Sequence, residues 1–116
     1  YKNNETNPKG RAWFSEQMVY LMDLLKKTPD VDGRTMLDNT LIYLTSDMGN
    51  GSAHNNSRHP IVLAGGLIKG GQAMNMGGIG WNKLFDTLAA GLGLQLDDPD
   101  YPNFGRGAGT FSNMLS

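Results

Sequence analysis

Residues 40–66 read TLIYLTSDMGNGSAHNNSRHPIVLAGG and decide the fold, because an apolar run breaks into a polar loop and then returns to a second apolar run. The first run predicts a strand over residues 40–46, and the second predicts a strand buried on both faces over residues 61–64. Loops that leave the carboxyl edge of an open parallel sheet commonly hold ligands. The loop over residues 47–60, which begins with Asp47, is therefore the first candidate for a functional site.

The sequence on either side of this stretch predicts two helices. Residues 8–27 carry Pro8 at the first helical position, two lysines at the far end, and Pro29 just beyond it. Residues 81–91 have leucines at helical spacing and end in glycine. A broad apolar stripe runs along the first helix, formed by Phe14, Met18, Leu21, Met22 and Leu25 and widened by Trp13, Tyr20 and Leu24.

The remaining segments are rich in glycine and predict loops. Residues 65–80 form a glycine-rich loop in which residues 72–76 are a candidate short strand, and residues 95–116 are expected to be an irregular tail. The glycines fit neither nucleotide-binding loop pattern. The spacing of Asp30, Asp32, Gly33 and Asp38 does not match a calcium loop and predicts a solvated turn. The seven methionines are interpreted as core residues.

Composition excludes several classes of protein. The chain has 116 residues, a formal net charge of -1 and 18% charged residues, so an electrostatic grip on nucleic acid is not expected. The absence of cysteine excludes disulfides and thiolate metal sites. No apolar run approaches the roughly 20 residues that span a bilayer, so no membrane span is expected. The first residue is Tyr1 and not methionine, which indicates a processed or truncated product.

The predicted elements are too few for a self-sufficient α/β domain. A buried sheet needs its inner strands paired on both sides, since each unpaired buried backbone group costs about 1–3 kcal/mol. We therefore expect residues 1–116 to be a single partial domain, the carboxyl-terminal piece of a larger α/β domain. The expected partner is the remainder of that parent domain or another protein chain.

The most specific pattern in the chain is NTLIYLTSDMGN over residues 39–50, followed by His54 and then by PIVLAGG. It resembles the carboxyl-terminal part of an exported bacterial family of unknown function in the alkaline-phosphatase-like superfamily, which includes sulfatases and cofactor-independent phosphoglycerate mutases. The likeness extends from about Arg11 to the final FGRGAGTFSNML, and His54 precedes Pro60 by six positions, as in the mutase pattern.

This resemblance implies a fold, an activity and a location. The fold is the carboxyl-terminal portion of an alkaline-phosphatase-like sandwich, a mainly parallel sheet between helices. The activity is metal-assisted hydrolysis of a phosphate or sulfate ester, with Asp47 as a ligand to one divalent metal and His54 as a ligand to the other. Zinc, calcium, magnesium and manganese are the candidate metals. The family is exported, so the expected location is the periplasm or the cell surface.

One position departs from the sulfatase and mutase pattern. The histidine that follows the aspartate there is Met48 in this chain, and a thioether is a poor ligand for such metals. The exported family also typically carries methionine at this place, often with glutamate where Asp47 stands. The alternative function is therefore a non-catalytic structural or interaction subunit that keeps the fold and has lost metal ligands.

Each candidate site residue also has a structural interpretation. Asp47 could cap the turn after its strand, and His54 could be an exposed loop histidine. Asn50 and His59 are candidates for binding the substrate, with turn formation and packing as the alternatives. The histidine just before Pro60 occupies an apolar position of the pattern, which favours packing.

Overall fold

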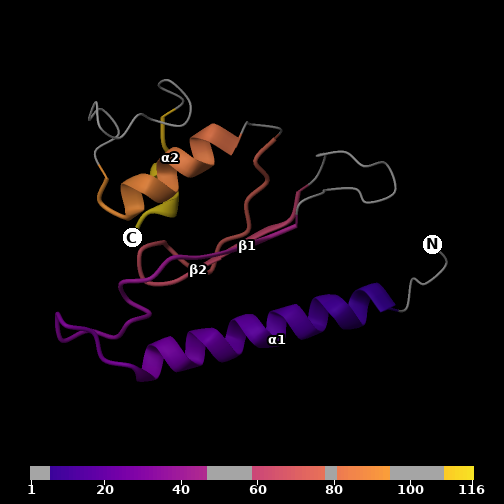
Figure 1. Ribbon diagram of the computed structural model, residues 1–116. Coiled ribbons are helices and arrows are strands. Elements are labelled where there is room, and N and C mark those ends of the chain that lie inside the picture. Colours follow the sequence, from indigo (N-terminus) through magenta and orange to yellow (C-terminus); the bar gives the residue numbers. More distant parts are fainter. Residues whose placement is uncertain (1–5, 47–58, 78–80, 95–108) are drawn as a thin grey trace. The chain divides into compact units, whose positions relative to one another are not determined.

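A computed structural model of the chain describes residues 6–46, 59–77, 81–94 and 109–116 (Figure 1). These residues separate into two compact units, Tyr1–Asn39 and Thr40–Ser116, which are described one at a time. The described elements, in chain order, are the helix α1 (Thr6–Lys27), the strands β1 (Ile42–Thr45) and β2 (Ile61–Ala64), the helix α2 (Trp81–Gly91) and the 3₁₀ turn η1 (Ser112–Met114).

The first unit consists of α1 and the loop that follows it. α1 has 22 residues and ends in Lys26 and Lys27, as predicted. It begins at Thr6, two residues before the predicted range of 8–27. The Thr28 hydroxyl donates to the Leu24 carbonyl at 2.8 Å, and so satisfies one of the carbonyls that a helix end leaves open. Pro29 follows directly, and proline cannot continue a helix.

The loop after α1 is a hydrogen-bonded turn. Asp30 N donates to the Arg34 carbonyl at 2.7 Å, and Gly33 N donates to the Asp30 carbonyl at 3.2 Å. Gly33 has a φ of 82°, the left-handed conformation that a three-residue hairpin loop needs at this position. An antiparallel bridge joins Pro29 and Thr35 below the turn. The segment therefore is the turn that its sequence predicts.

The second unit is built on the pair β1–β2, which is antiparallel. Ile42 pairs with Ala64 and Thr45 pairs with Ile61. The expected parallel arrangement is not seen between these two strands. A parallel pair needs a crossover, usually a helix, whereas an antiparallel pair needs only a loop, and the Asn- and Gly-containing sequence of residues 46–60 has no helical pattern. The described fold is therefore mixed α and β with a two-stranded antiparallel sheet.

The two faces of the strand pair differ in their surroundings. Tyr43 meets Phe85 of α2 with ring centroids 6.2 Å apart, and Ile61 and Leu63 line a cavity together with Leu84 of α2. Val62 points to the opposite face, because side chains alternate along a strand, and it is 49% exposed. The prediction that β2 is buried on both faces is wrong for this residue.

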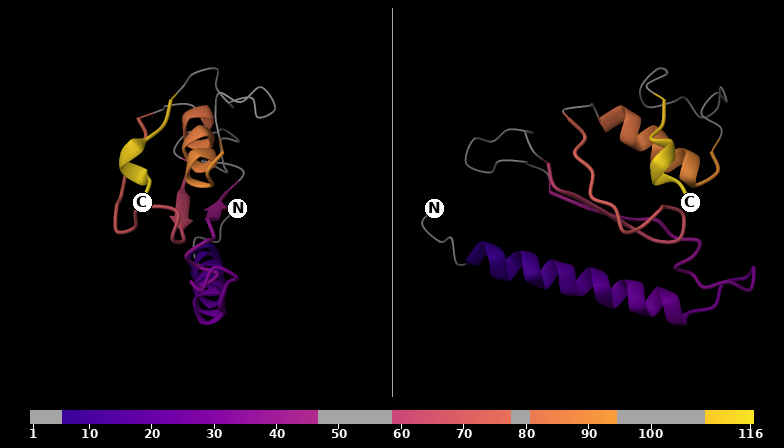
Figure 2. Two further views of the ribbon diagram at one scale, coloured as in Figure 1. Left: turned by 90° about the vertical axis from the view of Figure 1, so that its left-hand side faces the viewer. Right: turned by 180° about the vertical axis from the view of Figure 1, so that it is seen from behind.

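The helix α2 spans the predicted residues and is buried on more sides than its leucine stripe indicates. Its buried residues are Leu84, Asp86, Thr87, Leu88 and Ala89. The carboxyl-terminal segment explains the second buried side, since it lies beside α2 in Figure 2 and Phe111 N donates to Thr87 Oγ1 at 2.8 Å. The Lys83 ammonium lies 4.7 Å from the centre of the Phe111 ring. Leu92 lies one residue beyond the end of the helix and is exposed.

The glycine-rich and terminal segments join each other. Ile68 forms an antiparallel bridge with Leu115, and Lys69 N donates to the Met114 carbonyl at 2.8 Å. Residues 72–76, the candidate short strand, form no strand. Within the described ranges, no helix is both long enough and apolar enough to cross a bilayer.

Replacing Thr87 with valine should loosen the carboxyl-terminal segment. The Thr87 hydroxyl is fully buried, donates to the Lys83 carbonyl at 2.7 Å and accepts from Phe111 N. Valine keeps the shape and leaves the amide without its acceptor, so we expect a loss of about 1–3 kcal/mol in the free energy of unfolding. Urea denaturation of the whole chain measures this loss. Ser15→Ala on α1 is the control, because water can replace its exposed hydroxyl, which donates to the Arg11 carbonyl at 3.0 Å; equal losses in both variants would contradict the assignment.

Candidate functional site

The strand pair fixes both ends of the predicted site loop. Thr45 and Ile61 are opposite each other at the end of the sheet, and Thr45 Oγ1 donates to the Pro60 carbonyl at 3.0 Å. Residues 46 and 60 therefore leave the sheet side by side. The two ends of the intervening segment are therefore held at one end of the strand pair, and loops fixed to a scaffold in this way commonly carry binding residues.

His59 is the candidate site residue that the structure describes. It is half-buried, and its ring meets the ring of Trp81 edge-on, with the centroids 4.8 Å apart and an angle of 81° between the planes. Trp81 stacks on Phe85 at 6.1 Å, and Phe85 in turn meets Tyr43. A row of aromatic side chains thus connects the exit of the site loop to α2 and β1. The contact supports the packing interpretation of His59 and also gives its ring a defined position.

The other candidate residues, Asp47, Asn50 and His54, lie outside the described residues, as does Met48. Among the residues that the structure does describe, no group of three or more His, Cys, Asp or Glu side chains is arranged so that it could hold a metal ion. The metal ligands and the substrate-binding role of Asn50 therefore stay predictions from the sequence.

The acidic residues of the first unit form a separate cluster with structural partners. Asn39 Nδ2 donates to Asp30 Oδ2 at 2.8 Å and to Asp32 Oδ2 at 2.9 Å, and the Arg34 guanidinium pairs with Asp32 at 2.9 Å. Asp38 Oδ2 accepts from the amide and the hydroxyl of Thr35. These carboxylates accept hydrogen bonds from residues of the same turn, and so they stabilise the turn.

These hydrogen bonds shift the acidity of two carboxyl groups. Donation from the Asn39 side chain, followed by donation from Arg34 N, lowers the pKa of Asp32 from 3.8 to about 2. The backbone and side-chain hydrogen bonds from Thr35 lower the pKa of Asp38. A carboxyl group whose pKa is lower in the folded than in the unfolded state stabilises the fold above its unfolded value, and that stabilisation is lost as the pH falls through the folded value.

The turn should therefore weaken in acid, between about pH 4 and pH 2. We expect the Asp32 carboxyl carbon to titrate in NMR with a midpoint near 2. Asn39→Ala should move that midpoint toward 3.8, because it removes the hydrogen bond that contributes most to the lowered pKa of Asp32. A midpoint for Asp32 that is the same in both proteins would refute this account of the turn.

Two features of the second unit were missed by the sequence interpretation. Asp86 and Thr87 are buried polar residues of α2 outside its leucine stripe, and the polar residue types themselves predict exposure. The contact between Trp81 and His59 could not be inferred either, because the two residues are distant in sequence.

No family model matches the chain, and no curated protein or solved structure matches it either.

Proposed function

We propose that this chain is part of a metal-assisted phosphate or sulfate ester hydrolase of the alkaline-phosphatase-like type, in which the loop over residues 47–60 forms one wall of the site. The observation that carries the proposal is the anchoring of this loop by the Thr45–Ile61 pair and by the hydrogen bond from Thr45 to Pro60. The loop sequence supplies carboxylate, imidazole and amide groups between these fixed ends.

The donor set of the loop suits divalent metals. In this proposal the Asp47 carboxylate holds one metal and the neutral His54 imidazole holds the other, and both groups are ordinary ligands for zinc, while carboxylates also suit magnesium, manganese and calcium. When bound, such metals polarise the ester oxygens and lower the pKa of the attacking hydroxyl. Met48 would contribute no ligand to hard or borderline ions.

Asn50 and His59 are proposed to contact the ester group. An amide N–H and an imidazole N–H are neutral donors that can bind the non-bridging oxygens of a phosphate or a sulfate. The edge-on contact with Trp81 orients the His59 ring, so this donor would be aimed before substrate arrives. The remaining ligands and the nucleophile are assigned to the remainder of the parent domain or to another chain, in an exported, periplasmic or cell-surface protein.

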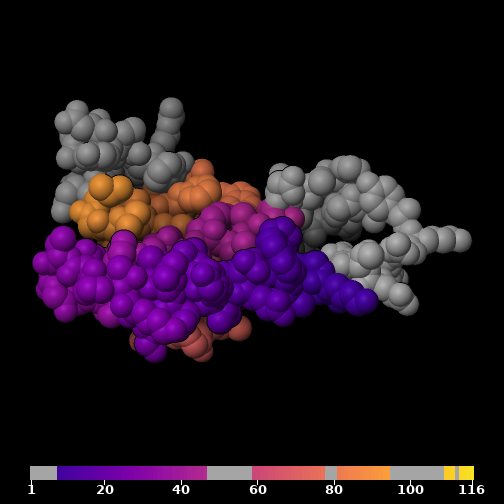
Figure 3. Space-filling model, turned by 60° about the horizontal axis from the view of Figure 1, so that its bottom comes forward, coloured from indigo at the N-terminus to yellow at the C-terminus, as the bar shows by residue number. Residues whose placement is uncertain are grey.

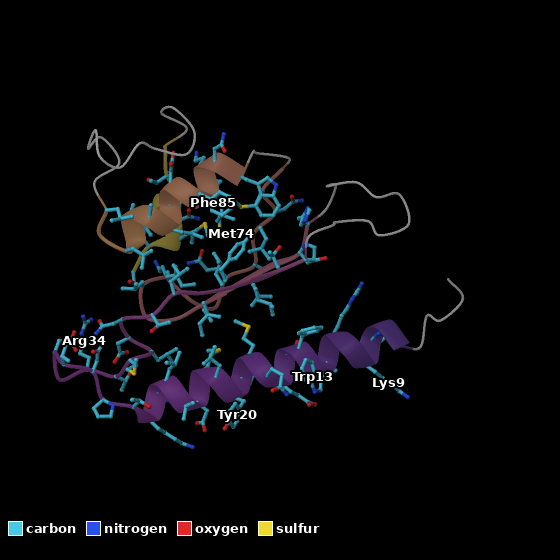
Figure 4. The ribbon with its side chains drawn as sticks, in the orientation of Figure 1. Lys9, Trp13, Tyr20, Arg34, Met74 and Phe85 are labelled. Carbon is cyan, nitrogen blue, oxygen red and sulfur yellow. The ribbon has the colours of Figure 1, made fainter. Side chains whose placement is uncertain are left out.

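A second candidate function is that of a non-catalytic interaction subunit with the same fold. It is favoured by the large apolar side chains that are exposed on α1. Figure 3 shows the surface of α1 in indigo and purple. Trp13 and Tyr20 are labelled on α1 in Figure 4. Exposed apolar side chains at this density are typical of a surface that another protein covers. The large apolar residues of α1 that are exposed are Trp13, Phe14, Val19, Tyr20, Leu21 and Leu24.

Metal content distinguishes the two functions. We expect the chain, produced together with the remainder of its parent domain, to retain divalent metal in inductively coupled plasma mass spectrometry after extensive dialysis. Asp47→Asn and His54→Gln should each lower the metal content because each removes a ligand. Asp23→Asn, on the exposed face of α1, is the matched control and should leave it unchanged. A folded wild-type protein that retains no metal would reject the hydrolase and favour the interaction subunit.

A further inference from the structure

A cavity of about 150 Å³ lies in the second unit between β2, α2 and the segments that contain residues 68–76 and η1. Three methionines line it, Met74, Met76 and Met114, and we name it the methionine cavity. Met74 lies on the side of the strand pair that carries α2 (Figure 4). Three of the chain's seven methionines are therefore gathered at one place.

Local hydrogen bonds hold these methionines together. Lys69 N donates to the Met114 carbonyl at 2.8 Å, and the Gln72 side chain donates to the Asn113 carbonyl at 3.2 Å. These bonds tie η1 to the segment that leads into Met74. The Asn113 amide nitrogen lies 4.0 Å from the Met74 sulfur, which is the distance of a weak hydrogen bond to a thioether. The backbone thus brings residues about 40 positions apart to the same cavity.

The lining of the methionine cavity selects one class of ligand. No carboxylate and no imidazole line it, and the side-chain oxygen of Gln72 alone does not supply the several oxygen ligands that a hard cation needs. The thioethers are soft sulfur ligands, which select Cu(I) among the biological first-row metals. The chain has no cysteine, so methionine supplies its sulfur ligands. We propose that the methionine cavity binds Cu(I) through the sulfur atoms of Met74, Met76 and Met114.

Simple packing does not account for the arrangement as well as metal binding does. Methionine is a good filler of irregular cores, but here its side chains border an open cavity, and Met74 is 41% exposed. That exposure gives a metal ion a route to the sulfur. Lys69 is the cationic residue of the lining, and a lysine beside apolar surface buries its carbon stem and keeps its ammonium in water. Lys69→Gln should therefore leave Cu(I) binding intact or strengthen it, because it removes the repulsion between the lysine ammonium and the metal cation.

Methyl NMR of the 116-residue chain tests the proposal directly. Cu(I) is added under a reductant, with Ag(I) as a soft ion that does not change oxidation state, to protein labelled at the methionine methyl groups. We expect the resonances of Met74, Met76 and Met114 to shift together and saturate. Three methionines of the first unit, Met18, Met22 and Met36, should not shift. Similar shifts at all six methyl groups, or no saturation, would overturn the proposal.

Substitution by leucine adds a second readout. Leucine has nearly the volume of methionine and lacks the sulfur, so each variant should keep its far-ultraviolet circular dichroism. In competition with a chromogenic Cu(I) chelator, each single variant at the cavity should bind at least about tenfold more weakly, the lower end of the loss seen even for indirect supports of a metal site. The triple variant M18L/M22L/M36L is the matched control. Equal affinities for the cavity variants and the wild type would also reject the site. The result is independent of the hydrolase proposal, because neither Asp47 nor His54 takes part.

Discussion

Replacing Gly65 with alanine is expected to cause the largest loss of stability in the chain. Gly65 has a φ of 118°, which L residues rarely adopt, and a Cβ atom built there would lie 1.9 Å from the Thr40 carbonyl oxygen. The oxygen belongs to the backbone just before β1, so relieving the clash would require the end of the strand pair to open. We expect about 4 kcal/mol or more of destabilisation, the range that marks a backbone incompatibility.

Gly93→Ala separates the steric clash with Thr40 from the conformational cost of a positive φ. Gly93 also has a positive φ, 80°, but a Cβ there would meet nothing within 4 Å. Its substitution should cost only the conformational term, about 1–2 kcal/mol. Urea denaturation of the two variants measures the loss of stability in each. In NMR, the amide resonances of β1 and β2 should broaden in Gly65→Ala and not in Gly93→Ala. Similar small losses for both glycines would show that Gly65 does not pack against Thr40 as described.

Leu84→Ala is expected to have the second largest effect. Leu84 is 3% exposed on α2 and lines the methionine cavity with Ile61 and Leu63 of β2. Truncation removes buried apolar surface and enlarges an existing cavity, so the free energy of unfolding should fall by about 2–5 kcal/mol. The loss is expected toward the upper end if the surrounding side chains do not collapse into the space.

Leu92→Ala is the matched control for this substitution. Leu92 lies just after α2 in the same unit and is 55% exposed. Its truncation should change stability by no more than about 0.5 kcal/mol. If Leu84→Ala and Leu92→Ala had the same small effect in urea denaturation, the packing of α2 on β2 would not be the core of this unit.

The sequence predicts the local elements well because their signals are local. The terminal lysines and Pro29 mark the end of α1, and Gly91 ends α2. The start of α1 is less exact, because the helix begins at Thr6 and Pro8 is its third residue, not its first. The direction of strand pairing could not be read in the same way, since the apolar runs of β1 and β2 suit either direction. Gly65 shows the same limit, because two adjacent glycines predict a turn but do not say that Thr40 lies against one of them.

Contacts between distant segments explain the remaining differences. Thr87 accepts a hydrogen bond from the amide of Phe111, which is 24 residues away in the sequence. The bridge between Ile68 and Leu115 brings together two distant segments that line the methionine cavity. The prediction for the site rests on the pattern around Asp47 and His54, and the structure adds to it the anchoring of the loop and the contact between His59 and Trp81.

The central claim is the proposal that the loop over residues 47–60 supports metal-assisted ester hydrolysis. The most direct measurement is the rate at which the chain, together with the remainder of its parent domain, hydrolyses p-nitrophenyl phosphate and p-nitrophenyl sulfate with and without added divalent metal. We predict metal-dependent hydrolysis of at least one ester, reduced at least about a hundredfold by Asp47→Ala, because that variant removes a direct metal ligand. Hydrolysis that is equally fast in Asp47→Ala, or no metal-dependent hydrolysis of either ester, would contradict the claim.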